Sequence, residues 1–126
     1  MRCSARMTIF ATLAALVNTA ASAGGPSFSC ARASAADERA ICNSPSLSAA
    51  DARMTALYHD IQGCTMMGAR GNNIDDQRAW LARRASCGGN TACLTRLYRA
   101  RIAEFGPLAA KARKLMRAEE CPGPLR

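Results

Sequence analysis

The chain has 126 residues, and its 17 Lys and Arg residues outnumber 9 Asp and Glu residues, which gives a formal charge of +8. Apolar residues recur at helical spacing and β-branched residues are few, so the sequence favours an all-α fold and excludes a mainly β one. Aromatic residues make up 5% of the chain and do not alternate with basic ones, so nucleic-acid binding is not expected.

The first 23 residues have the pattern of a secretory signal peptide. Two arginines precede an apolar run from Met7 to Ala21, and small residues at Ala21 and Ala23 form a cleavage site. The run is shorter than the roughly 20 apolar residues of a membrane span, and Cys30 lies too far beyond it to carry a lipid anchor. We expect cleavage after Ala23, a single mature domain of residues 24–126 without a transmembrane span, and a periplasmic or secreted location.

Six cysteines follow this leader: Cys30, Cys42, Cys64, Cys87, Cys93 and Cys121. An even number in a short exported chain predicts three disulfides. A zinc site is disfavoured because there is no Cys-x2-Cys pair and the only histidine, His59, has no ligand partner nearby. The sequence does not choose among the possible pairings. We favour Cys30–Cys42 and Cys87–Cys93 as local links at helix ends, which leaves Cys64–Cys121.

Two helices are predicted in the first half of the mature chain. Ser34 and Asp37 resemble a capping box, so a short helix should begin there and end near Cys42. A second helix should run from Ser46 or Ser48 to about Gly63. Its apolar face is formed by Leu47, Ala50, Met54, Leu57 and Ile61.

Glycine and asparagine dominate residues 68–73, which predicts a loop. A third helix should start after Asn73 and stop at Cys87, where Gly88 can end it. One face of this helix carries Ile74, Gln77, Trp80 or Leu81, and Arg84.

Thr91 should cap a fourth helix whose apolar positions are Leu94, Leu97, Tyr98, Ile102 and Phe105. Gly106-Pro107 should break or kink this helix, and the basic residues 108–120 should continue as helix. The sequence therefore predicts one small all-α bundle of four to five helices with three disulfides.

Three segments have a recognisable pattern when they are taken together. They are Ser27-Phe28-x-Cys30-x11-Cys42, then Pro45-x-Leu47 and Leu57-Tyr58 with Asp51 between them, and finally Gln77-x2-Trp80-Leu81-x2-Arg84-x2-Cys87-x5-Cys93 with Leu94, Tyr98, Arg101 and Ile102 after it. This pattern resembles the LprI-type lysozyme-inhibitor family over nearly all the mature chain. The resemblance implies a small exported helical domain with disulfides and, for some relatives, binding and inhibition of a lysozyme. The chain departs from the family in lacking an expected lipid anchor and in having Cys64 and Cys121 as an extra pair.

Three residues of the third helix are candidates for partner binding. Trp80 is the only tryptophan and could anchor an interface, or it could belong to the core. Gln77 and Arg84 lie one turn away on either side of it. They could form a polar recognition face, or they could bond helix ends and loop carbonyls around the core.

Arg70 is a fourth candidate, because it lies between two glycines in the expected loop. Glycoside hydrolases use two carboxylates in their cleft. A guanidinium group that reached this pair would form charge-assisted hydrogen bonds and exclude substrate. The alternative is an ordinary solvated arginine.

No catalytic set, metal cluster or phosphate-binding loop is recognisable, so we expect neither an enzyme nor a cofactor. Adjacent residues such as Asp75 and Asp76 diverge by about 100° around a helix and would not share a site. The predicted function is an exported lysozyme inhibitor that occludes the enzyme's cleft. The alternative is a non-inhibitory envelope module that binds anionic cell-wall polymer or lipid through its arginine-rich C-terminal segment. Removal of the leader reduces 17 basic residues to 15 against 9 acidic ones, a formal charge of +6 that suits such partners.

Overall fold

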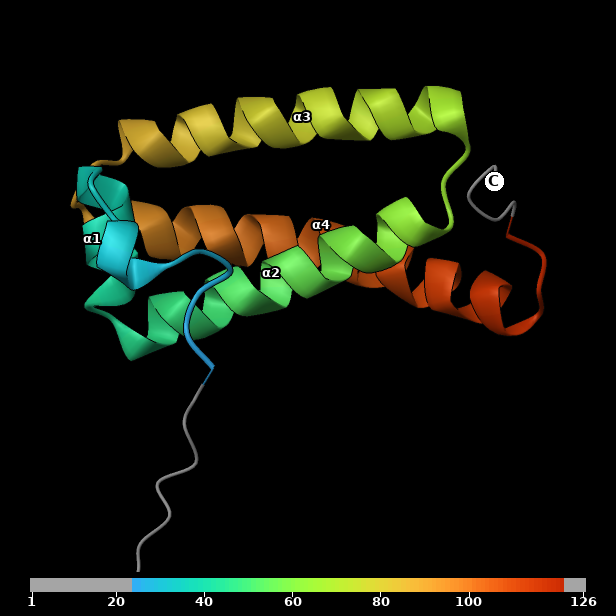
Figure 1. Cartoon of the computed structure of the whole chain (residues 1–126), viewed down its shortest axis with the longest axis horizontal. Helices are drawn as coiled ribbons and strands as arrows, with labels where there is room; N and C mark the ends of the chain where they lie inside the picture. The colour runs from blue at the N-terminus through green and yellow to red at the C-terminus, as the bar shows by residue number, and fades with distance from the viewer. Residues whose placement is uncertain (1–23, 122–126) are drawn as a thin grey trace, which may run out of the picture.

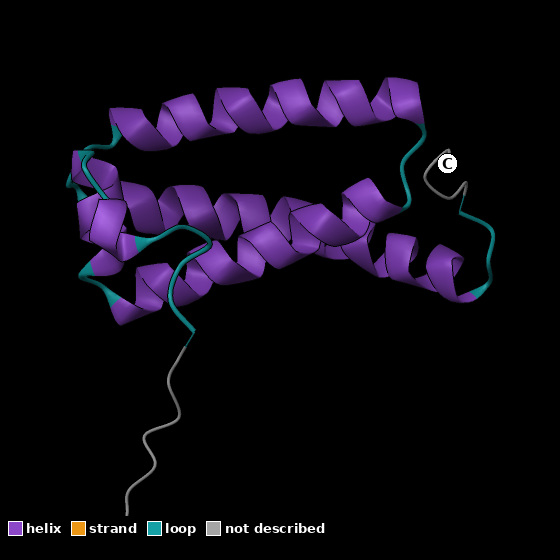
Figure 2. Ribbon diagram, in the orientation of Figure 1, coloured by secondary structure: helices purple, strands orange, loops and turns teal. Residues whose placement is uncertain are grey.

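The computed structural model describes residues 24–121 and has four α-helices with one short 3-10 helix before them (Figure 1). The elements are η1 (Cys30–Arg32), α1 (Ala36–Cys42), α2 (Pro45–Gly63), α3 (Met67–Ser86) and α4 (Thr91–Arg117). No strand occurs within the described range, so the predicted all-α class is confirmed (Figure 2). The predicted signal peptide lies outside the described residues.

Helices α2 and α4 form the closely packed pair of the bundle, and α3 returns in the opposite direction beside them (Figure 1). The short α1 lies at the end of the bundle where α3 gives way to α4. Buried apolar side chains from all four helices meet in one core: Ile41, Leu47, Met54, Leu57, Trp80, Leu94, Tyr98, Phe105 and Ala109. The predicted apolar faces of α2 and α4 supply most of this core, as their spacing requires.

The structure overturns the loop predicted at residues 68–73, because α3 already begins at Met67. The Arg70 amide donates to the Met66 carbonyl at 2.8 Å, as a helical turn requires. The Arg70 and Asn73 side chains both bond Gln62 of α2. These tertiary contacts outweigh the low helix propensity of glycine, which is a difference of about 1 kcal/mol per residue.

Of the break or kink predicted at Gly106-Pro107, the break does not occur, because α4 is one helix of 27 residues that contains Pro107. Proline removes one backbone hydrogen bond and crowds the preceding turn. Phe105, Ala109 and Ala112 are buried on either side of it, so apolar packing keeps both halves of α4 against the core. The cap of α4 is Asn90 rather than Thr91, since the Asn90 side chain accepts a hydrogen bond from the Cys93 amide at 2.9 Å.

The first helix is capped differently from the predicted Ser34–Asp37 pair. The Glu38 carboxylate accepts hydrogen bonds from the amides of Ser34 and Ala35 at 3.0 and 3.1 Å. Glu has the longer side chain and can fold back over the first turn. Asp37 is thereby left to point inward, where it is 2% exposed.

All three disulfides form in the favoured pairing: Cys30–Cys42, Cys64–Cys121 and Cys87–Cys93. The first ties the N-terminal segment to the end of α1, and the second joins the end of α2 to the residues after α4. The third spans the turn between α3 and α4, where Gly88 adopts a positive φ of 53°. Loop-entropy arguments assign about 2–3 kcal/mol to each short link and about 4 kcal/mol to the long one.

Candidate functional site

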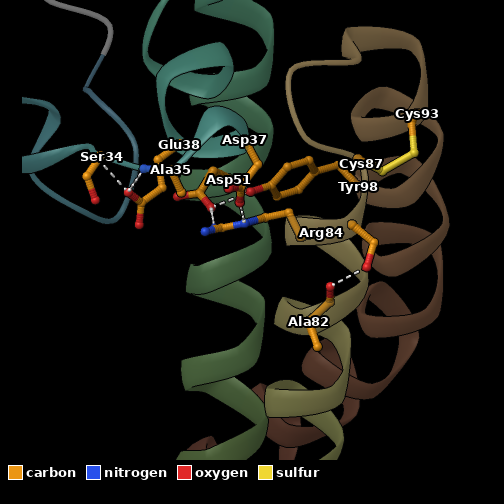
Figure 3. Close-up of polar contacts among 11 residues, drawn as sticks. Ser34, Ala35, Asp37, Glu38, Asp51, Ala82, Arg84, Cys87, Cys93 and Tyr98 are labelled. Atoms are coloured by element: carbon orange, nitrogen blue, oxygen red, sulfur yellow. Dashed lines mark hydrogen bonds and ion pairs between the residues drawn. A yellow bond between two sulfur atoms is a disulfide. The ribbon is translucent and has the colours of Figure 1, made fainter.

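Arg84 of α3 lies at the centre of a polar network inside the bundle (Figure 3). Its Nε donates to Asp37 at 2.8 Å, and its Nη1 lies 3.7 Å from the Asp51 carboxylate of α2. The guanidinium also lies over the Phe28 ring, 5.4 Å from its centroid. The two carboxylates are almost fully buried, so this one cation joins α1, α2 and α3 from within.

Tyr98 of α4 completes this network through Asp51. Its hydroxyl donates to Asp51 at 2.7 Å, and the backbone amide of Ser27 donates to the other Asp51 oxygen at 2.6 Å. Burial, and then the hydrogen bond to Asp51, raise the pKa of the Tyr98 hydroxyl well above its usual range. Burial by itself lowers the pKa of Arg84, but the Tyr98 oxygen and the Asp37 carboxylate raise it by more. The network is therefore held by a protonated tyrosine and a charged arginine.

A second buried arginine, Arg101 of α4, holds the middle of α3. It is 3% exposed and bonds Asp76 at 2.6 Å, Gln77 at 3.0 Å and Glu104 at 3.0 Å. Its guanidinium also lies 4.1 Å from the centroid of the Phe105 ring. The arginine-rich C-terminal segment runs from Arg96 to Arg117, and within it Arg101 serves packing inside the domain rather than the surface.

The structure places all four predicted partner-binding residues toward the bundle. Trp80 is 2% exposed and meets Tyr98 edge to face, with ring centroids 5.1 Å apart. The side-chain oxygen of Gln77 accepts a hydrogen bond from Arg101, and its side-chain nitrogen lies 3.6 Å from the Met54 sulfur. Arg70 is half-buried and donates to the Gln62 carbonyl at 2.9 Å. Arg84, Trp80 and Gln77 therefore share one inward face of α3, with Arg70 at its N-terminal end.

The residues of the LprI-like pattern can now be placed in the structure. Most residues that carry the resemblance are disulfide cysteines or members of the buried networks, including Trp80, Arg84, Tyr98 and Arg101. Asp37 also belongs to these networks but is outside the pattern, and its role required knowledge of how α1 meets α3. Most of the pattern therefore specifies the interior of the domain rather than a partner-binding surface.

A groove between α2 and α4 is the best candidate for such a surface. Its volume is about 240 Å³, and we call it the α2–α4 groove. Leu47, Ala50, Tyr98 and Ile102 form an apolar floor, and Arg53 and Arg99 lie beside it. Both arginines are exposed, and no acidic residue lines the groove. Arg53 was missed from the sequence, because only the packing of α2 on α4 brings it to the same groove as Arg99.

The charges of the domain are distributed unevenly between its interior and its surface. Seven of the nine acidic residues bond within the domain: Asp37, Glu38, Asp51, Asp60, Asp75, Asp76 and Glu104. The exposed basic residues that form no ion pair within residues 24–121 are Arg32, Arg39, Arg53, Arg83, Arg96, Arg99, Lys111, Lys114 and Arg117. The surface therefore presents an excess of uncompensated cations to any anionic partner.

No group of three or more His, Cys, Asp or Glu residues within the described range could hold a metal ion. None of the helices described is both long and apolar enough to cross a membrane. Comparison of the chain with protein-family models, characterised proteins and solved structures finds no match.

Proposed function

We propose that the protein is an exported, non-catalytic inhibitor that binds a lysozyme and occludes its cleft with the α2–α4 groove. The observation that carries this proposal is the pair of exposed arginines beside an apolar floor that has no carboxylate. The resemblance to LprI-type inhibitors supports it, as does a disulfide-linked helical domain of the kind that the resemblance implies. Three disulfides also suit an oxidising compartment, in agreement with the expected signal peptide.

The chemistry of the groove fits the chemistry of a glycosidase cleft. Such enzymes hydrolyse their substrate between two carboxyl groups. The planar guanidinium groups of Arg53 and Arg99 can each form paired, charge-assisted hydrogen bonds with a carboxylate. The apolar floor can at the same time accept an apolar side chain from the rim of the cleft. Arg70, the earlier candidate for this role, is replaced because its side chain is bonded to Gln62 within the domain.

The proposal is tested by a turbidity assay of cell-wall lysis with the oxidised mature protein, residues 24–126. The protein should be titrated against animal-type and goose-type lysozymes. We expect saturable inhibition of at least one of them near a one-to-one ratio. Absence of inhibition of both, with the three disulfides verified, would contradict the proposal.

Charge-reversal variants locate the contact. R53E/R99E should weaken inhibition at least tenfold, because two attractive contacts become repulsive at the enzyme's carboxylates. R83E/R117E is the matched control: it makes the same change of charge at two exposed arginines that do not line the groove. An equal loss of inhibition in both variants would show that net charge alone determines inhibition, and would contradict the assignment of the contact to the α2–α4 groove.

Salt separates local attraction from long-range repulsion. Many animal-type lysozymes are basic, so a basic inhibitor is repelled at a distance and should associate faster as salt screens that repulsion. The contacts of Arg53 and Arg99 with carboxylates should in contrast weaken with salt. Measuring association and dissociation rates separately would show both effects.

A second candidate function is binding to an anionic envelope polymer or lipid surface. The observation in its favour is that Lys114 and Arg117, near the end of α4, are exposed and form no ion pair within the described residues. K114E/R117E keeps Cys121 and therefore the Cys64–Cys121 link, which a deletion of residues 108–126 would remove. Loss of co-sedimentation with cell walls or phosphatidylglycerol vesicles in this variant, with R53E/R99E unaffected, would support this function. Unchanged co-sedimentation would contradict it.

A further inference from the structure

A second groove lies among α2, α3 and α4, at the end of the bundle that carries the Cys64–Cys121 disulfide. Its volume is about 360 Å³, and we call it the distal groove. Ile61, Leu108, Ala112 and Leu115 give it an apolar lining, and Asn73 and Lys111 contribute polar groups. A smaller hollow of about 80 Å³ shares Ile61, Asn73 and Leu108 with it, so the apolar surface continues along α4.

The distal groove exists because α3 is joined to its neighbours here by polar side chains. Arg70 and Asn73 both reach across to Gln62 of α2. Helix α3 contributes the polar side chain of Asn73 to the lining of the distal groove, beside the apolar side chains of Ile61 and Leu108. Leu108 is 50% exposed, so half of its apolar side chain is open to solvent at the distal groove.

Other apolar side chains are exposed at the same end of the molecule. Met66, in the link between α2 and α3, is 68% exposed, and Met116 of α4 is 37% exposed. Met116 lies against the end of α2, because a Cβ atom at Gly63 would be only 3.5 Å from its sulfur. Several exposed apolar side chains at one end of a domain mark a binding site more often than isolated exposed residues do.

The charge around the distal groove has one sign. Lys111 is exposed and forms no ion pair within residues 24–121, and no acidic residue lines the groove. Asp76 and Glu104 line the smaller hollow, but both are bound to Arg101. An occupant should therefore have an apolar part that follows Leu108 and Leu115 and an anionic group that meets Lys111.

We propose that the distal groove binds an anionic amphiphile with a single alkyl chain, such as a long-chain carboxylate. A volume of 360 Å³ is at the lower end of the range of small-molecule sites, which suits one chain rather than a two-chain lipid. Burial of the chain supplies the affinity, and the Lys111 ammonium bonds the head group. This site is separate from the α2–α4 groove, so its occupancy does not depend on lysozyme binding.

The test is a fluorescence titration of oxidised residues 24–126 with 11-(dansylamino)undecanoate below its micelle concentration. We expect saturable binding at a one-to-one ratio and displacement of the probe by decanoate but not by acetate. Leu108→Gln and Lys111→Glu should each weaken binding about tenfold, which corresponds to about 1.4 kcal/mol. Leu108 and Lys111 are both exposed, so neither variant should shift the midpoint of thermal unfolding appreciably.

Leu81→Gln and Arg83→Glu are the matched controls, because they make the same leucine substitution and the same reversal of charge at exposed positions of α3 that do not line the groove. They should bind the probe like the wild type. Absence of saturable binding, or equal weakening in the controls, would overturn the proposal. Light scattering that showed a dimer dissociated by Leu108→Gln would also overturn it, since the groove would then be covered by a second copy of the chain. Any of these results would leave the lysozyme assay unaffected.

Discussion

The α2–α4 interface and the inward face of α3 are built from different kinds of side chain. Helices α2 and α4 meet through aliphatic and aromatic groups such as Leu47, Met54 and Leu94, and their backbones lie close together. Helix α3 instead reaches its neighbours through Arg84 and Gln77, and Trp80 is the large apolar residue that is almost fully buried among residues 68–86 of this helix. Apolar packing is tolerant of small shifts, whereas a buried ion pair needs one geometry.

This difference accounts for both the shape of the domain and the place of its candidate sites. Long polar side chains hold α3 farther from α2 and α4 than these two helices lie from each other (Figure 1). The distal groove is the surface that this spacing leaves open. The α2–α4 groove lies between the two closely packed helices, where Arg53 and Arg99 are not used for folding.

The largest expected effect comes from removing the cation of the buried network. Arg84→Ala should destabilise the fold by about 3–5 kcal/mol, because Asp37 and Asp51 would be left buried without a positive partner. Chemical denaturation followed by the fluorescence of Trp80 measures this change. Arg83→Ala, at the adjacent exposed position, should change stability by less than about 0.5 kcal/mol. Similar changes in stability for the two variants would contradict the claim that the inward face of α3 contributes more to stability than its exposed face.

A smaller effect is expected from the hydroxyl of Tyr98. Tyr98→Phe keeps the ring in the core but removes the hydrogen bond to Asp51, which should cost roughly 2 kcal/mol near neutral pH. If the variant proves as stable as the wild type, the network is held by Arg84 alone.

The same hydroxyl predicts how stability depends on alkaline pH. The pKa of Tyr98 is raised in the folded state from its ordinary value of 10.0, so the folded protein keeps a proton that the unfolded chain loses. The contribution of Tyr98 is therefore complete below about pH 10 and is lost progressively as the pH rises above it, by up to about 1.4 kcal/mol per pH unit. Tyr98→Phe should remove this part of the decline. An identical alkaline profile in the variant would contradict the assignment.

The smallest expected effect concerns a surface ion pair. Arg113 bonds Asp60 at 2.6 Å, but its side chain is 43% exposed. Arg113→Ala should therefore cost less than about 1 kcal/mol, and raising the salt concentration should reduce the difference further. A loss as large as that of Arg84→Ala would show that exposure does not distinguish these pairs.

The sequence predicted the elements whose signals are local. Apolar spacing located α2 and the first half of α4, Gly88 marked the end of α3, and the expected three disulfides formed as favoured. The prediction was wrong where tertiary contacts decided the outcome. Glycine and asparagine before residue 74 indicated a loop, yet Arg70 and Asn73 bond α2 and extend α3 by two turns.

The candidate site was harder to predict than the fold. Gln77, Trp80 and Arg84 stood out because they are large or polar at regular spacing, but that spacing is shared by interior networks and recognition faces. The partners of Arg84, Asp37 and Asp51, lie 47 and 33 residues from it in the sequence, so only the folded chain shows that they meet. Arg53 had no local signal at all, since its role depends on the neighbouring helix.

The most direct test of the account compares lysozyme inhibition by two variants under conditions in which both are folded. Tyr98→Phe alters the interior but keeps the aromatic surface of the α2–α4 groove, whereas R53E/R99E alters only that groove. We predict that Tyr98→Phe inhibits like the wild type despite its lower stability, and that R53E/R99E loses inhibition at least tenfold with its stability unchanged. Loss of inhibition in Tyr98→Phe together with full inhibition by R53E/R99E would contradict the account.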